Sequence, residues 1–589
     1  MKFIQSLLFL GLVLLLNACT DQSPENAQQL GNTIVSQILS EPQSLHPTNG
    51  ISGSRSNILY FTNQSLTRID PEKLELVPLL AEKLPRISAN GLKYTYRLHP
   101  DAAWDDGTPM TAEDVLFSLK VVKCPLLENK AGSSLYQIIK DARLYAKDDR
   151  KITFEMRKKY VNNLYLTNSF FILDRRKFDP KGLLENFTLE QFGNPDSTLL
   201  ADPNLVKWAN EFNDPKYGRN VKYLFGTSGP YKVTDWVPEQ QIVLSRRKNY
   251  WGKNLEGPAH SQYPEKIIFK KLTDEKSLEL EIKQQKVDVA PYLNSPTYDN
   301  LINSETATEN YYLGFKEKDG YSYIGYNTRP DGITHPLVLN DKQVRRALAY
   351  AIPLDDIIQQ YYNGRASRIF SPVSPFHPDY NRNLNPIPFN LDSASAILTR
   401  SGWTDQNGDQ VREKELNGEN VPLKITLSYP ANSTTIENIV FRIKTEVAKV
   451  GIEVIQEPLD FNLLVSKVTN HDYEACLLGS SSPLIPYDFI QNWSSDGWTA
   501  GTNLTGFSTP ETDSLMKMAR VELDTEVRKE MVDRIQEIIY DEQPAFFLYN
   551  RTNHIAIHKR YENAGMFQIM PYVLLNNLKA RETVTADVN

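Results

Sequence analysis

The amino-acid sequence predicts an α/β protein in which strands and helices alternate along the chain. Three segments carry this prediction. Residues 93–98 alternate apolar and polar side chains as a strand does, residues 344–358 place apolar side chains at helical spacing, and residues 421–457 have the pattern of a strand, a helix and a second strand. A unit of that last kind implies a parallel strand pair within a mixed sheet.

The first segment, KYTYRL, is the pattern of a half-buried strand. Residues 105–107, DDG, are typical of a turn, and Thr111 with Asp114 three residues later predicts a capping box at the start of a helix. Acidic residues in a first turn also complement the helix dipole. We therefore expect a strand, a turn and a helix in this order.

The other two segments predict four further elements and a second capping box. Residues 344–358 predict one amphipathic helix, with Arg345 and Arg346 on the face opposite its apolar side chains. Within 421–457, a strand over 423–428 precedes a helix that starts at a capping box of Thr434 and Glu437. Gly451 ends that helix, and residues 452–455 begin the next strand.

The N-terminal residues MKFIQSLLFLGLVLLLNAC have a positive Lys2 and an uncharged run, 7–16, that is too short to span a bilayer. Residues 16–19, LNAC, resemble the lipobox of bacterial lipoproteins. The resemblance implies that residues 1–18 are a signal peptide and that Cys19 receives diacylglycerol. Two or three acyl chains would hold the protein durably, because one gives only marginal binding. The polar residues 19–32 then form a flexible tether. An ordinary secretory signal with a chance cysteine is the alternative.

Bulk properties exclude several classes of protein. Removal of the first 18 of 589 residues leaves 571, enough for about three or four domains. The 65 basic and 72 acidic residues provide no cationic face, so no nucleic acid partner is expected. Besides the lipidated Cys19, only Cys124 and Cys476 remain after processing, which excludes a disulfide scaffold and a thiolate zinc cluster. We favour two buried thiols over a single bridge between them.

Residues 79–119, LLAEKLPRISANGLKYTYRLHPDAAWDDGTPMTAEDVLFSL, resemble the signature of the extracellular solute-binding proteins of family 5. These are the oligopeptide-, dipeptide- and nickel-binding proteins of ABC importers. The shared features are a leucine-alanine step, a glycine-leucine pair, a tyrosine-rich strand and a tryptophan followed by an acidic-glycine-threonine-proline turn. Further similar blocks follow in the family's order: residues 41–47 with His46 where aspartate is usual, 226–231, 250–252, 285–290, 344–352, 391–405 and 544–549.

The resemblance implies a two-lobed fold like that of type II periplasmic binding proteins, the three-domain cluster, with mixed sheets and a hinge. Ligand would be enclosed between the first and third domains by hinge closure. The expected division is a signal peptide at 1–18, a lipidated tether at 19–32, domain I in the three parts 33–66, 176–312 and 546–589, domain II at 67–175 and domain III at 313–545.

One departure from the family concerns the ligand. In peptide-binding members an aspartate after a glycine-tryptophan pair neutralises the peptide's α-ammonium, and leaving that buried cation unpaired would cost several kcal/mol. The corresponding run here, LGSSSPLIPYD at 478–488, has no tryptophan and no carboxylate at the expected step. Asp488, five residues further along, is one substitute, and the serines offer hydroxyls or form a plain polar turn. A blocked peptide or an uncharged solute therefore stays open. The cleft-lining candidates that the resemblance implies are Glu41, Gln43, Ser44, Trp104, Thr227, Ser480, Ser481, Asp488 and Trp493.

Metal and enzyme signals are weak. Residues 405–409, DQNGD, have oxygen ligands at alternate positions, but the glycine falls at position four instead of six and position twelve is Leu416, so we expect a solvent-exposed turn. His554 and His558 lie in a predicted strand, where about 13 Å would separate them and exclude a shared metal. The sequence contains no HExxH, GxSxG, Walker or GxGxxG motif. We expect no enzyme activity, no metal and no cofactor.

These observations predict a monomeric, lipid-anchored substrate-binding protein of an ABC importer. It would capture oligopeptides or a similar small solute on the periplasmic side of the cell membrane and deliver them to the permease subunits. A surface lipoprotein hydrolase acting on peptides or glycans is the alternative. A helical glycan-capture lipoprotein conflicts with the strands predicted at 93–98 and 423–429.

Overall fold

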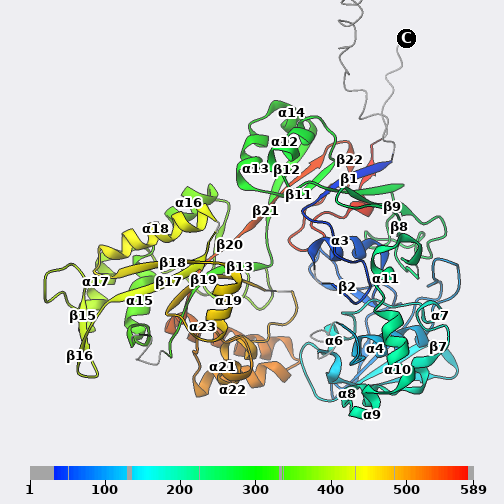
Figure 1. The fold of residues 1–589 in the computed structure, drawn as a ribbon, viewed down its shortest axis with the longest axis horizontal. Helices are drawn as coiled ribbons and strands as arrows, with labels where there is room; N and C mark the ends of the chain where they lie inside the picture. Colours follow the sequence, from blue (N-terminus) through cyan, green and yellow to red (C-terminus); the bar gives the residue numbers. More distant parts are fainter. Residues whose placement is uncertain are drawn as a thin grey trace, which may run out of the picture.

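A computed structural model describes residues 32–50, 52–128, 135–224, 226–329, 335, 337–431, 433–482 and 484–581. The predicted signal peptide, Cys19 and all but the last residue of the tether lie outside these ranges. Three larger sheets organise the described chain (Figure 1). The six-stranded sheet forms one lobe, and the seven-stranded and four-stranded sheets lie together in the other. None of the described helices combines the length and the apolar run needed to cross a bilayer.

The seven-stranded sheet gathers segments from both ends of the chain. Its order is β12-β21-β11-β1-β10-β9-β8, and β1 pairs in parallel with both β10 and β11. Ile34 of β1 and Phe61 of α3 belong to its hydrophobic core. The strands are β1 (Thr33–Ile38), β8 (Tyr231–Val237), β9 (Gln241–Arg246), β10 (Lys266–Lys271), β11 (Val289–Leu293), β12 (Tyr311–Glu317) and β21 (Thr552–His558), and the helices beside them are α3 (Gly53–Thr62), α11 (Lys216–Arg219), α12 (Glu275–Lys283), α13 (Ser295–Ile302) and α14 (Glu305–Asn310).

The four-stranded antiparallel sheet, β4-β5-β7-β6, contains the strand expected at 93–98. The capping box of Thr111 and Asp114 is present at the start of α4, so this part of the prediction is confirmed. The elements are β4 (Arg86–Ile87), β5 (Lys93–Arg97), β6 (Ile139–Tyr145), β7 (Asp148–Met156), α4 (Ala112–Lys123), α6 (Asn163–Leu166), α7 (Arg175–Phe178), α8 (Leu189–Gly193), α9 (Ser197–Leu200) and α10 (Pro203–Phe212), with the short hairpin β2 (Thr67–Ile69) and β3 (Leu76–Pro78) nearby.

The six-stranded sheet has the order β14-β20-β13-β19-β17-β18. β17 and β18 pair in parallel across α18, which confirms the strand, helix, strand unit. The elements are β13 (Gly320–Tyr326), β14 (Ser367–Arg368), β17 (Lys424–Pro430), β18 (Glu453–Leu459), β19 (Ala475–Ser481), β20 (Ala545–Asn550), α17 (Leu391–Arg400), α18 (Thr434–Ala448), α19 (Phe461–Thr469), α20 (Ile490–Trp493), α21 (Ser495–Ala500), α22 (Pro510–Val521) and α23 (Thr525–Glu542). Two small hairpins complete the described strands: β15 (Glu413–Leu416) with β16 (Glu419–Pro422), and β22 (Tyr561–Glu562) with β23 (Lys579–Ala580).

Two details of the helix predictions are wrong. The helix α18 is capped by Ser433, whose side chain accepts from the Ile436 N–H, because Thr434 is already helical and cannot serve as the cap. Residues 344–358 form two helices, α15 (Lys342–Ala351) and α16 (Leu354–Tyr362), which meet at Pro353. A proline lacks the backbone N–H that a helix interior needs, so one continuous helix is unfavourable here.

Arg345 does not lie on a solvated face as predicted. It is only 4 % exposed, and its guanidinium donates to the backbone carbonyls of Leu339, Asn340, Glu542 and Gln543. Arginine has five N–H donors, so several carbonyls together can satisfy it in the interior. The side chain therefore ties the start of α15 to the end of α23.

The chain crosses between the two lobes twice. The first crossing lies between β12, which ends at Glu317, and β13, which begins at Gly320. The second is Arg551, between β20 and β21, and the Lys318 N–H donates to the Arg551 carbonyl at 2.9 Å. Each crossing begins where a strand ends, because β12 stays paired within its own sheet up to Glu317 and β20 within its own sheet up to Asn550. These paired segments form the hinge.

Cys124 and Cys476 are both buried and both carry free thiols, as predicted. Burial raises the pKa of each thiol to about 12, although backbone hydrogen bonds partly oppose this. Each cysteine therefore acts as a small apolar side chain in its own lobe.

Candidate functional site

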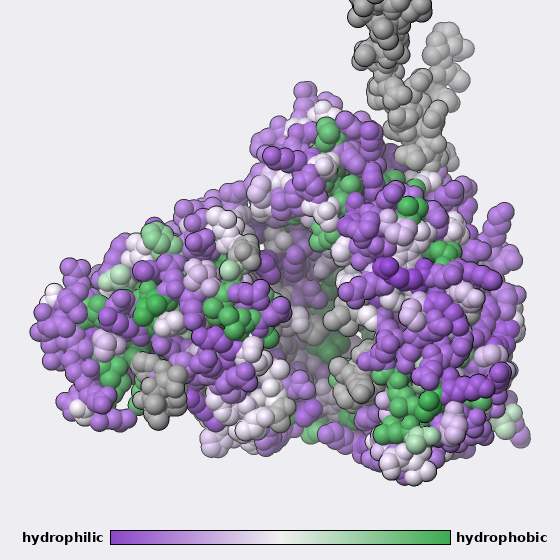
Figure 2. Space-filling view, viewed as in Figure 1, coloured by the Kyte–Doolittle hydropathy of each residue, from purple (hydrophilic) through white to green (hydrophobic). Residues whose placement is uncertain are grey.

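A cavity of about 1110 Å³ lies between the lobe of the four-stranded sheet and that of the six-stranded sheet. Figure 2 shows the surface hollowed between the two lobes. The volume slightly exceeds the usual range of small-ligand sites, about 300–1,000 Å³. One wall consists of Ile69, Leu135, Tyr136, Gln137, Ile138, Arg157, Lys158, Tyr160, Asn162, Tyr165, Leu166, Asn168 and Ser169, and the other of Ser480, Ser481, Ile485, Pro486, Tyr487, Asp488, Gln491, Asn492 and Arg520.

The two lobes touch directly at the edge of this cavity. The Tyr160 hydroxyl donates to Asp488 Oδ2 at 3.0 Å, and Asn162 Nδ2 donates to the Pro486 carbonyl at 3.0 Å. The Val161 N–H also donates to the Arg520 carbonyl at 2.9 Å. We call this group of bonds the interlobe contact. The residues that the four-stranded-sheet lobe contributes to it directly precede α6, which lies far from β20 and β21 in Figure 1.

Asp488 is already neutralised inside the protein. Its Oδ2 lies 3.1 Å from Arg520 Nε, and its Oδ1 accepts from the Ile490 N–H at 3.2 Å. The Arg520 guanidinium also lies 5.1 Å from the centre of the Tyr160 ring. This carboxylate therefore has a cation from its own lobe and a hydroxyl donor from the opposite lobe.

A buried ion pair fixes the loop that carries Asp488. Asp379 and Arg528 are 9 % and 6 % exposed and lie 2.5 Å apart. Asp379 Oδ2 accepts from the Tyr487 N–H at 2.8 Å, and Arg528 donates to the Tyr487 carbonyl at 2.9 Å. Burial opposes ionisation of Asp379, but the hydrogen bond and charge of Arg528 outweigh it and hold the pKa of this carboxyl below its usual value. His377 adds a contact from its Nε2 to the Ile485 carbonyl at 2.9 Å.

Three of the nine residues suggested by the sequence line the cavity: Ser480, Ser481 and Asp488. Trp493 is 4 % exposed and packs against Phe547 with ring centres 5.9 Å apart. The indole N–H of Trp493 has no hydrogen-bond partner among the described residues.

The candidates near the N-terminus, in the lobe of the seven- and four-stranded sheets, make contacts within that lobe and do not line the cavity. Glu41 accepts from Trp236 Nε1 at 2.6 Å, the Gln43 carbonyl accepts from Arg219, and Ser44 Oγ accepts from the His46 N–H. None of the three is among the residues that line the cavity.

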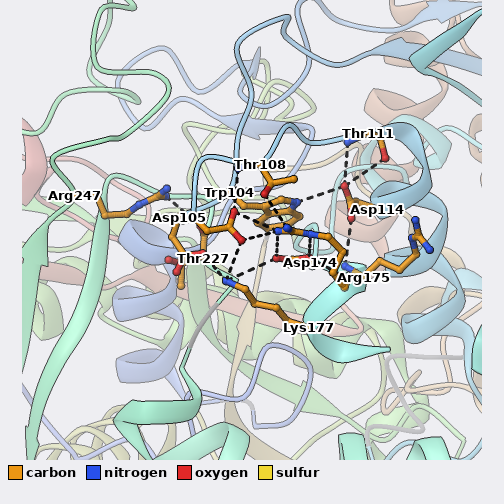
Figure 3. A network of polar contacts seen from close by, with 12 residues as sticks. Trp104, Asp105, Thr108, Thr111, Asp114, Asp174, Arg175, Lys177, Thr227 and Arg247 are labelled. Carbon is orange, nitrogen blue, oxygen red and sulfur yellow. Dashed lines mark hydrogen bonds and ion pairs between the residues drawn. The ribbon is translucent and has the colours of Figure 1, made fainter. Parts of the chain in front are cut away.

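Trp104 lies in the polar network drawn in Figure 3. It is fully buried, and its Nε1 donates to Asp114 Oδ2 at 3.4 Å. Asp114 Oδ1 accepts from the Arg175 N–H at 3.2 Å, and Lys177 pairs with Asp105 at 2.9 Å. Burial raises the pKa of the Asp114 carboxyl despite these donors, and the nearby charge of Asp174 raises it further. Residues of the 79–119 signature thus connect the turn at 105–107 and the start of α4 to α7.

Thr227 lies at the edge of the same network. It is 6 % exposed, and its carbonyl accepts from Arg247 at 3.0 Å. Arg247 also donates to the Gly229 carbonyl at 2.8 Å, which fixes the 226–231 block. Trp104 and Thr227 are therefore placed within the first lobe and away from the residues that line the cavity.

The acidic turn at 405–409 and the two histidines of β21 make further contacts in the structure. Glu413, which is buried, brings a third carboxylate to Asp405 and Asp409, with ligand atoms within 4.8 Å of one another. Backbone N–H groups already donate to all three, for example Gln406 to Glu413 at 2.8 Å. His554 and His558 lie in β21, as predicted, and contact Arg365 and Gln285 respectively.

Five residues that shape the cavity edge were not predicted from the sequence. They are Tyr160, Asn162, Arg520, Asp379 and Arg528. Tyr160 and Asp488 are 328 positions apart, and Asp379 and Arg528 are 149 apart. None of them lies in a block that resembles the family, so no local pattern marks them.

Two α/β lobes joined by paired hinge segments, with a cavity between them, define a hinged two-lobed binding protein. The chain belongs to the bacterial extracellular solute-binding proteins, family 5, whose middle region matches residues 75–501. It is 26% identical to the oligopeptide-binding protein AppA of Bacillus subtilis over 574 residues, which cover 94% of this chain and 93% of that protein.

Solved structures show the same fold. The oligopeptide-binding protein AppA from Bacillus subtilis, in complex with a nonapeptide, superposes with a TM-score of 0.67 at 22% identity, covering 93% of this chain and 99% of the other. The ABC transporter substrate-binding protein CtaP from Listeria monocytogenes gives a TM-score of 0.72 at 18% identity, covering 93% and 99%. The predicted α/β two-lobed class and the family are thereby confirmed.

Proposed function

We propose that this protein binds peptides in the interlobe cavity and delivers them to the permease of an ABC importer. The observation that carries the proposal is the cavity between two hinged lobes in a member of this family. Binding shifts such a protein towards its closed form, which shields the guest from water and presents one shape to a transporter. We also propose a division into three domains, with domains I, II and III built around the seven-, four- and six-stranded sheets.

A strand edge beside the cavity supports a peptide as the guest. β19 pairs with β13 along its full length, but β17 pairs only with Ala475 and Cys476 at its start. Among the described strands, none pairs with residues 477–481 on the β17 side, and Ser480 and Ser481 line the cavity. An extended peptide can add to such an edge through its backbone, independently of its side chains. The relative AppA is an oligopeptide-binding protein, which agrees with this proposal.

Binding without catalysis fits the side chains of the cavity. A hydrolase that uses a pair of carboxyl groups would need free ones there. The carboxylate among the described lining residues is Asp488, which is held by Arg520 and Tyr160. We therefore propose that the chain is not an enzyme.

Peptide binding is expected to stabilise the full-length protein and to make it more compact. A guest at 100 times its Kd adds about 2.7 kcal/mol to the free energy of unfolding. A peptide pool should therefore raise Tm, and X-ray scattering should show a smaller radius of gyration. An amino-acid mixture at equal mass is the matched control. If the pool changes neither Tm nor the scattering profile, and native mass spectrometry finds no retained peptide, the proposal is wrong.

We also propose that Cys19 carries the lipid anchor on the periplasmic side of the membrane. Labelled palmitate should enter the wild-type chain and be lost in Cys19→Ala, because that thiol is the acceptor in the resembling motif. Cys124→Ala, which changes a buried thiol, should retain the label. Incorporation into Cys19→Ala at the wild-type level would contradict the anchor and leave the binding proposal intact.

A further inference from the structure

We infer that the cavity selects peptides that carry a carboxylate and does not require a free α-ammonium on the peptide. This inference rests on the proposed peptide-binding function and specifies the class of peptide. It follows from the state of each charged side chain that lines the cavity, Arg157, Lys158, Asp488 and Arg520.

Two of the three cations are already compensated. Arg157 makes two hydrogen bonds of 3.1 Å to Glu190, and its Nε donates to the Gln137 carbonyl at 2.9 Å. Arg520 is paired with Asp488 at 3.1 Å. Such pairs present little net charge to a guest.

The anion of the cavity is not available to an ammonium group. Both Asp488 oxygens already have partners: Oδ2 contacts Tyr160 and Arg520, and Oδ1 accepts from Ile490. To pair with the Asp488 carboxylate, a peptide ammonium would have to displace Arg520. The Arg520 guanidinium would then be uncompensated and would lie beside a second cation. Removing a charged group's partner in a desolvated site is unfavourable. The guest's N-terminus is therefore not bound here.

Lys158 is the cation that remains. It is an exposed residue between β7 and α6, it lines the cavity, and it makes no ion pair with any residue of the described ranges. A side-chain or C-terminal carboxylate of a peptide would form an ion pair with the Lys158 ammonium group. Complementary charge of this kind contributes mainly to specificity.

Four five-residue peptides with amidated C-termini test the inference by titration calorimetry on the full chain. Each carries one glutamate or one lysine, with a free or an acetylated N-terminus, so a side-chain carboxylate is the one carboxylate that a peptide offers. We expect the glutamate peptides to bind about tenfold more tightly than the lysine peptides, and acetylation to change Kd by less than about threefold. Lys158→Glu should reverse the preference. Lys147→Glu, in the exposed turn between β6 and β7 and outside the cavity lining, makes the same charge change and should leave the preference unchanged.

A second variant separates the two possible roles of Asp488. If Asp488 bound the peptide ammonium, Asp488→Asn would weaken only the peptides with a free N-terminus. We expect it to weaken free and acetylated peptides equally, because it loosens the interlobe contact. Tenfold weaker binding on acetylation, or equal affinity for glutamate and lysine peptides, would overturn the inference while peptide binding stands. Failure of all four peptides to bind would overturn the proposed function and this inference with it.

Discussion

Replacement of Asp379 with alanine is expected to lower the free energy of unfolding by about 3–5 kcal/mol, the usual cost of removing one member of a buried ion pair. The Arg528 guanidinium, 5 % exposed as a residue, would be left as an uncompensated cation. The Tyr487 N–H would lose its acceptor as well. Urea unfolding followed by fluorescence measures the change, which should appear in the midpoint with an unchanged slope.

The same substitution is expected to weaken peptide binding. Asp379 and Arg528 hold both backbone groups of Tyr487, so they place Pro486 and Asp488 against the other lobe. Without that support, the loop that carries Pro486 and Asp488 would be mobile. The interlobe contact would then form less often, and the closed form would be less populated. An affinity is reduced by the fraction of molecules in the competent state.

The neighbouring pair on the same helix provides the control. Arg534 of α23 pairs with Glu511 at 3.0 Å, and both side chains are about half exposed. Glu511→Ala should change the free energy of unfolding by less than about 1 kcal/mol, because solvent screens the charges. The double variant Asp379→Leu/Arg528→Met should recover much of the stability that the single variant loses, since an apolar pair leaves no buried charge. A single-variant effect as small as that of Glu511→Ala would show that this pair does not fix the loop.

The elements predicted correctly are those whose signals lie within a few residues. Thr111 and Asp114 cap α4 from three positions apart, and the parallel pair β17–β18 follows from one strand, helix, strand unit. The break between α15 and α16 also had a local signal, Pro353, which the apolar periodicity around it obscured.

What the sequence could not predict depends on distant partners. Arg345 occurs in an amphipathic pattern that places it towards solvent, but carbonyls almost 200 positions later in the chain satisfy it in the interior. Asp488 could be suggested as a cavity residue from the family resemblance. Its neutralisation by Arg520 and its hydrogen bond from Tyr160 could not, because these contacts exist only once two lobes have folded and met.

Acidification from pH 6.5 towards pH 4 is expected to destabilise the protein strongly, because burial lowers the pKa of four histidines to about 4. His46 shows why. Its Nε2 donates to the Phe212 carbonyl at 2.7 Å, and its Nδ1 accepts from the Thr48 N–H at 3.2 Å and the Asn49 N–H at 3.3 Å. A proton on Nδ1 would remove that acceptor.

Burial lowers the pKa of His46 to about 4, a shift that the Phe212 hydrogen bond opposes and the charge of Arg55 increases. Burial also lowers the pKa of the other three to about 4: His260, His554 and His558. In the unfolded chain these groups titrate near pH 6.5. Between pH 6.5 and 4 the unfolded chain therefore binds more protons, so stability is complete above pH 6.5 and falls as the pH falls, by up to about 1.4 kcal/mol per pH unit for each histidine.

Single-histidine variants measure the contribution of the histidines to this pH dependence more directly than the wild-type protein does. The buried carboxyls of Asp114 and Asp288 have a pKa raised by burial, so they act in the opposite direction at low pH. Unfolding free energies at pH 7, 6 and 5 should show that His46→Gln, which cannot titrate, reduces the slope by about 1 kcal/mol per pH unit over this range, because the full slope of about 1.4 is reached only well below pH 6.5. His558→Gln, at the end of β21, should reduce the slope by a similar amount, and the two effects should add because the sites are independent. A slope that neither substitution changes would mean that these imidazoles accept protons without opening the fold.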